Sequence, residues 1–114
     1  MANLNWHKPD DIWPSLMGLY LDSIAHEGIY IIWYEGAENT CICIGQGNIA
    51  TKLKEHRNDD KIIKYSVQGP LRVTWANANP LMRDGIERFL KEKYLPLEHD
   101  SLPRDNPHEV NLPF

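Results

Sequence analysis

Two apolar segments on either side of a short polar loop constrain the fold of this chain more than any other feature. Residues 29–34 are β-branched and aromatic, residues 40–44 form a second segment of the same kind, and the loop between them is polar around Gly36. This pattern predicts a β-hairpin with a five-residue loop. Both faces of the first segment are apolar, so we expect its strand to be covered on both sides, although periodicity alone leaves a buried helix as the alternative.

Signals for a third strand and for three helices follow the hairpin. Asn48 is a favoured N-cap residue, and Asn79 followed by Pro80 combines an N-cap with the residue preferred at the first helical position. The predicted elements are a helix over 49–57, a short helix over 60–65, a strand over 71–76 and a helix over 80–94. This order predicts an α/β chain of the α+β type, with a small three-stranded, mainly antiparallel sheet flanked by helices.

The length of 114 residues suits one domain with one core. Within 1–114 we expect residues 1–27 to form an N-terminal arm packed on the body, residues 28–96 to form the core, and the Pro-rich residues 97–114 to form an extended tail. No apolar run approaches the roughly 20 residues needed to span a bilayer, and the amino terminus lacks a signal-like apolar segment. We therefore expect a cytoplasmic protein with no membrane partner; the oligomeric state is not indicated.

Two cysteines, Cys41 and Cys43, lie two residues apart on the second predicted strand. Alternate residues of a strand point to the same face, so we expect their side chains to share one face as buried free thiols. A zinc site is the alternative, but neither a second cysteine pair nor a spaced histidine pair accompanies them.

The net charge of −4 and the pI near 5.7 provide no general attraction for nucleic acid. Positive charge is concentrated locally, at Lys52, Lys54, Arg57, Lys61 and Lys64. Any contact with a phosphate backbone must therefore depend on this local group.

Short motifs lie on these predicted elements in a fixed order. They are Gly28-Ile29-Tyr30 and Cys43-Ile44-Gly45 in the hairpin, Lys52 and His56 in the following helix, and Glu87 in the last helix. Over about residues 28–96 this set resembles the GIY-YIG nuclease superfamily. Cys43 stands where that family has tyrosine, and Lys52 stands where it has arginine.

The resemblance implies hydrolysis of nucleic-acid phosphodiester bonds, with DNA favoured over RNA, using one divalent ion, Mg²⁺ or Mn²⁺. Glu87 would be its protein ligand. Tyr30 would orient or deprotonate the attacking water, Lys52 would offset phosphate charge, and His56 would contact a phosphate or assist proton transfer. The residues implied to border the substrate are Gly28, Cys43, Gly45, Lys54 and Arg57.

Each catalytic candidate also has a purely structural interpretation. Tyr30 is an ordinary strand aromatic, Lys52 and His56 form a solvated helix face, and Glu87 forms a surface ion pair with Lys91 four residues later. The asparagine that the family carries after its glutamate helix has no counterpart at the usual distance. Candidates to replace it are His99, Asp100, Asn106 and Asn111.

These departures, together with the acidic pI, leave two alternative functions. One is a catalytically inactive relative that binds nucleic acid, and the other is a protein-interaction module on the same scaffold.

Overall fold

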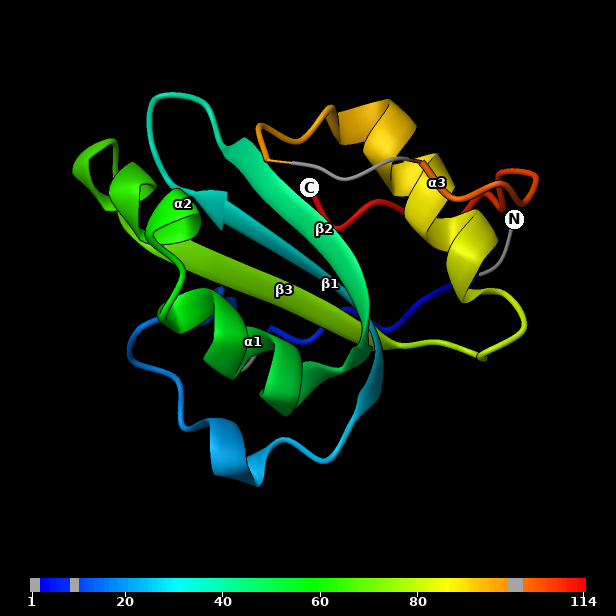
Figure 1. The fold of residues 1–114 in the computed structure, drawn as a ribbon, viewed down its shortest axis with the longest axis horizontal. Helices are drawn as coiled ribbons and strands as arrows, with labels where there is room; N and C mark the ends of the chain where they lie inside the picture. The colour runs from blue at the N-terminus through cyan, green and yellow to red at the C-terminus, as the bar shows by residue number, and fades with distance from the viewer. Residues whose placement is uncertain (1–2, 9–10, 99–101) are drawn as a thin grey trace.

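The computed structural model describes residues 3–8, 11–98 and 102–114. It contains a three-stranded antiparallel sheet in the order β2-β1-β3. The strands are β1 (Glu27–Tyr34), β2 (Thr40–Asn48) and β3 (Leu71–Asn77), and the helices are α1 (Ile49–Arg57), α2 (Asp60–Ile63) and α3 (Arg83–Tyr94), shown in Figure 1. This confirms the predicted α+β class.

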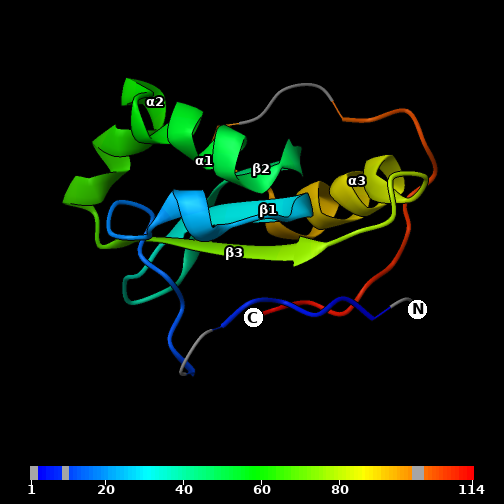
Figure 2. The same ribbon diagram turned by 90° about the horizontal axis from the view of Figure 1, so that it is seen from below.

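The central strand β1 is covered on both faces, as its two apolar faces predicted. On one face Tyr30 and Ile32 pack with Leu53 of α1 in a first core. On the other face Ile29 and Ile31 pack with α3 in a second core. Figure 2 shows α1 and α2 on one side of the sheet and both chain ends on the other side.

The second strand is longer than predicted and contains an irregularity. It continues through Gly45 to Asn48, because β1 begins at Glu27 and provides partners for these residues. Ile32 pairs with Cys43, whereas Trp33 pairs with Cys41, so the register shifts at a β-bulge.

The bulge separates the two cysteines. Cys43 packs beside Tyr30 in the first core, and Cys41 packs beside Trp33 in the second core. The prediction that their side chains share one face is wrong, because the bulge adds one residue and breaks the alternation. Both cysteines are buried, as predicted, and burial raises the pKa of the Cys41 thiol.

Local signals predicted the helix after the hairpin well. The Asn48 side chain accepts a hydrogen bond from the backbone nitrogen of Thr51 at 2.9 Å, and α1 ends at Arg57. The last helix starts later than predicted, at Arg83. The Asn79 side chain accepts from the nitrogen of Leu81 at 2.9 Å and so caps a turn that precedes α3.

The segments outside the sheet pack on the body. Leu16 donates its backbone N–H to Leu71 at 3.0 Å, which places the N-terminal arm beside the edge of β3. The chain ends are joined by Asn111, whose side chain donates to the carbonyl of Leu4 at 2.9 Å and whose carbonyl accepts from the Trp6 indole at 2.9 Å. Asn111 therefore holds the C-terminal tail against the N-terminal arm.

Candidate functional site

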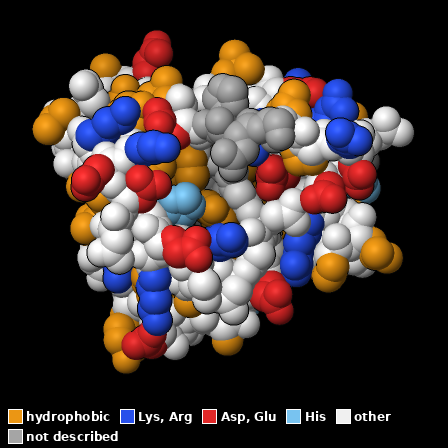
Figure 3. All heavy atoms as spheres, viewed as in Figure 1, with side chains coloured by type: hydrophobic (Ala, Val, Ile, Leu, Met, Phe, Trp, Pro, Cys, Tyr) orange, Lys and Arg blue, Asp and Glu red, His pale blue; other side chains and the backbone are white. Residues whose placement is uncertain are grey.

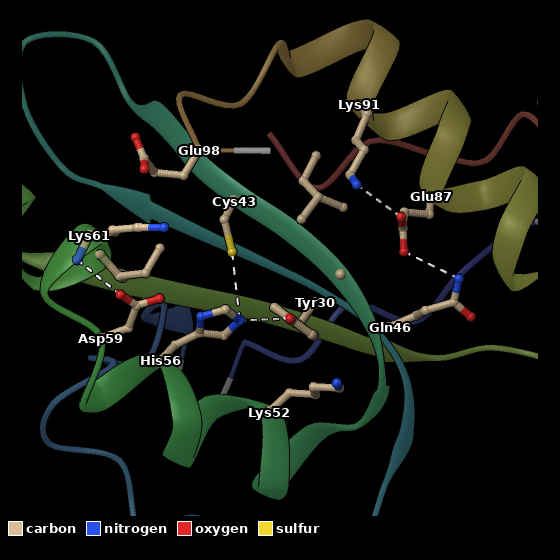
Figure 4. Close-up of a pocket in the computed structure, with 13 residues that line it drawn as sticks. Tyr30, Cys43, Gln46, Lys52, His56, Asp59, Lys61, Glu87, Lys91 and Glu98 are labelled. Atoms are coloured by element: carbon tan, nitrogen blue, oxygen red, sulfur yellow. Dashed lines mark hydrogen bonds and ion pairs between the residues drawn. The ribbon is translucent and has the colours of Figure 1, made fainter. Parts of the chain in front are cut away.

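A hollow of about 380 Å³ lies along the edge strand β2, between α1 and α2 on one side and α3 on the other (Figure 4). Tyr30, Lys52, His56 and Glu87 all line it, although they come from one strand and two helices. Three lysines and three carboxylates line it as well as His56. On the face viewed in Figure 3, acidic and basic side chains are likewise interspersed, so any attraction for phosphate is local.

One wall of the hollow, which we call the imidazole side, consists of Tyr30, Cys43 and His56. The Tyr30 hydroxyl lies 2.7 Å from Nε2 of His56, and the Cys43 sulfur lies 3.8 Å from the same nitrogen. Gly45 makes this contact possible, because a Cβ at that position would collide with the Tyr30 hydroxyl. The glycine of the second motif thus provides space for the tyrosine of the first.

Burial favours the neutral form of His56. Burial lowers its pKa from the ordinary value of 6.5, while nearby Asp59 and Glu55 oppose the shift and Lys52 adds to it. Its Nδ1 is buried, with no hydrogen-bond partner among the described residues. A neutral imidazole has one donor and one acceptor nitrogen. With Nε2 as the acceptor, His56 can take the proton of the Tyr30 hydroxyl.

The opposite wall, which we call the carboxylate side, consists of Gln46, Glu87 and Lys91. Nζ of Lys91 lies 2.9 Å from Oε2 of Glu87, and the Gln46 amide donates to Oε1 at 3.2 Å. Glu87 is only 9% exposed and Lys91 only 6%. The interpretation of this pair as a surface ion pair is wrong, because α3 lays this part of its surface against β2.

Glu87, on the carboxylate side, is the side chain that would bind the divalent ion implied by the sequence. The described residues contain no group of three side chains from His, Cys, Asp and Glu that could hold a metal. Mg²⁺ commonly takes only one or two protein carboxylates, with water and phosphate oxygens completing its coordination. Glu87 meets that need, and the Lys91 ammonium already places one positive charge against its carboxylate.

Lys52 extends from α1 toward the hollow from the imidazole side, as Figure 4 shows. It is half-buried, and its side chain passes beside Gly47, whose backbone has a φ of +123° that favours glycine. A lysine at this place supplies a single point charge rather than the planar fork of arginine.

Three of the residues implied to border the substrate lie elsewhere. Gly28 is packed against β3, where a Cβ would collide with the Ala76 carbonyl. The side chain of Lys54 forms an exposed ion pair with Asp22 at 2.6 Å. Arg57 donates to the carbonyl of Leu16 at 2.7 Å and so anchors the N-terminal arm.

Cys43 and Gly45 do border the hollow, and so does Lys61 of the predicted basic group. The sequence did not single out four other residues that line it: Gln46, Asp59, Lys91 and Glu98. The available signal was the position of Gln46 directly after the second motif, between Gly45 and Gly47. Neither Asn106 nor Asn111 lines the hollow, and His99 and Asp100 lie outside the described residues.

Comparison with known proteins yields no relative: no protein-family profile, curated protein or solved structure matches this chain. In the part of the chain that the structure describes, no helix is both long and apolar enough to cross a bilayer.

Proposed function

We propose that this chain is a GIY-YIG-like, metal-dependent endonuclease that hydrolyses phosphodiester bonds of nucleic acid in the hollow along β2. One observation carries the proposal: a phenol, an imidazole, an amine and a carboxylate from one strand and two helices line the same hollow. These four groups supply a proton acceptor, a positive charge and an oxygen ligand, which together suit phosphoryl chemistry.

The imidazole side would accept the proton of the attacking water. His56 is neutral and 2.7 Å from the Tyr30 hydroxyl, so it accepts the phenol proton while the phenol oxygen takes one from water. The Tyr30–His56 contact is part-buried and borders the hollow, so the phenol is placed beside the position of the attacking water. Lys52 offsets the charge that develops on the phosphate oxygens.

The carboxylate side would hold the divalent ion, Mg²⁺ or Mn²⁺, through Glu87. When bound, such an ion polarises the phosphate and stabilises the leaving oxygen. Gln46 keeps the carboxylate oriented by donating to Oε1, while the amide is itself held by Asp84 at 2.6 Å.

A cleavage assay tests this function. Supercoiled plasmid, single-stranded DNA and RNA are incubated with native protein and Mg²⁺ or Mn²⁺, and with the Glu87→Gln and Tyr30→Phe variants. We expect cleavage by native protein, with a loss of roughly a hundredfold or more in each variant.

Glu92→Gln is the matched control, because Glu92 lies on the same helix but pairs with Arg88 at the surface. It should cut as native protein does. Folding of every variant is checked by circular dichroism. Absence of cleavage by native protein with either metal, or full activity of Glu87→Gln, would rule out the proposed nuclease.

The second candidate function is nucleic-acid binding without cleavage. The observation that favours it is the ion pair between Lys91 and Glu87, which occupies the one carboxylate that the metal would use. Retention of labelled DNA at low salt that weakens in Lys52→Ala, without any cutting, would identify this function.

A further inference from the structure

The charged side chain of Lys91 is almost fully enclosed at the wall of the hollow. Only 6% of the residue is exposed, and lysine is rarely buried to this extent without a partner. Its ammonium nitrogen lies 2.9 Å from Oε2 of Glu87. The Gln46 amide donates to the other carboxylate oxygen at 3.2 Å, so each oxygen of Glu87 has one partner.

The position of Lys91 is also one from which its ammonium can move. Lys91 borders the candidate site and, on its other side, a smaller apolar hollow next to Leu95, Pro96 and Leu102. Its four-carbon stem is flexible and strongly apolar. Because Lys91 lines the candidate site, a rotation within its flexible stem would carry the ammonium from Glu87 into that hollow.

Binding a divalent ion and the Lys91 ammonium to the Glu87 carboxylate at the same time is energetically unfavourable. A divalent ion sits about 2.0 to 2.1 Å from its oxygen ligands, close to the place that the ammonium occupies. In an enclosed site the repulsion between like charges is only weakly screened. Binding of the ion therefore has to overcome the existing ion pair.

We infer that the Lys91 ammonium is a built-in competitor for the metal position on Glu87, displaced into the hollow when a divalent ion binds. There it is placed to bind a phosphate oxygen of the substrate. Without the divalent ion, Lys91 positions the Glu87 carboxylate. With the ion bound, Lys91 binds a phosphate of the substrate. This inference rests on the proposed function, whose divalent ion it concerns.

A Mn²⁺ titration without nucleic acid tests the competition directly. Binding of Mn²⁺ is measured by electron paramagnetic resonance and by calorimetry on native protein, Lys91→Gln and Glu87→Gln. Lys91→Gln keeps a hydrogen-bond donor of similar length but removes the charge. We expect it to bind Mn²⁺ about tenfold more tightly or better, and Glu87→Gln to bind none.

Lys93→Gln is the matched control, since Lys93 lies on the same helix with its amine over the ring of Phe89 at 5.7 Å. It should bind Mn²⁺ as native protein does. A second measurement follows thermal unfolding: Mn²⁺ should raise the melting temperature of Lys91→Gln more than that of native protein, since the ion replaces the missing charge. A double variant, Glu87→Gln with Lys91→Gln, should show no such rise.

The outcomes separate this inference from the proposed function. Equal Mn²⁺ affinity in native protein and Lys91→Gln overturns the competition, while metal-dependent cleavage lost in Glu87→Gln would leave the nuclease standing. Absence of Mn²⁺ binding even in Lys91→Gln overturns the competition, while cleavage of nucleic acid by native protein with Mn²⁺ decides the nuclease separately.

Discussion

Different interactions stabilise the two walls of the hollow. On the imidazole side, Tyr30 and His56 meet as neutral groups, and the contact depends on the space left by Gly45. On the carboxylate side, Glu87 and Lys91 meet as buried charges, and the contact depends on charge balance. The imidazole side should therefore lose stability when volume is added, and the carboxylate side should lose stability when a charge is removed.

The largest effect is expected on the carboxylate side. Lys91→Met removes the cation and leaves the buried Glu87 carboxylate uncompensated, which should lower the free energy of unfolding by about 3 to 5 kcal/mol. Guanidinium unfolding measures it. The double variant with Glu87→Gln should recover much of the loss, and an unchanged midpoint in Lys91→Met would mean that the pair is not enclosed as described.

Added volume on the imidazole side should have the next largest effect. Gly45→Ala places a methyl group against the Tyr30 hydroxyl and should cost about 1 to 3 kcal/mol of unfolding free energy. Gly36→Ala is the control, because a Cβ there meets only ordinary contacts at 3.5 Å or more. Equal stability of the two variants would remove the proposed role of Gly45.

Loss of the hydroxyl alone should change stability less. Tyr30→Phe keeps the ring and removes the hydrogen bond to His56, for an expected cost of about 0.5 to 1.5 kcal/mol. Tyr20→Phe, at an exposed position, should have no measurable effect. If Tyr30→Phe unfolds at the same denaturant concentration as native protein, the hydrogen bond contributes nothing to the imidazole side.

A pH series sharpens the comparison further. Burial lowers the pKa of His56, so the unfolded chain takes up its proton first as pH falls. The contribution of His56 to the free energy of unfolding is fully present above its ordinary pKa of 6.5. It is lost as the pH falls toward the lower pKa that His56 has in the folded protein. Unfolding of native protein and His56→Gln is measured at several pH values, and the variant should show the weaker dependence.

A residual dependence is expected in that variant, because burial and the neighbouring His26 also lower the pKa of His7. If native protein and His56→Gln lose stability in parallel below pH 6.5, the imidazole is not held neutral by its wall.

The smallest effect is expected outside both walls. Lys54→Ala removes an exposed ion pair with Asp22 and should leave stability and cleavage within experimental error. A marked loss of cleavage in this variant would extend the functional surface beyond the hollow.

Local signals in the sequence were sufficient for most of the fold. The hairpin, the cap at Asn48 and the strand over 71–76 depend on neighbouring residues, and the structure confirms all three. The predicted start of α3 was too early, because Asn79 caps a turn that precedes the helix. A capping residue in the sequence does not show whether a turn or a helix follows it.

The sequence by itself determined which groups the chain can bring to a site: the phenol of Tyr30, the imidazole of His56 and the carboxylate of Glu87, each on a predictable element. Only the tertiary structure decided which faces those elements turn inward. The bulge that separates Cys41 from Cys43, and the burial of Lys91 beside Glu87, depend on strand register and helix docking. These are set by contacts between residues far apart in the chain, and local sequence patterns do not encode them.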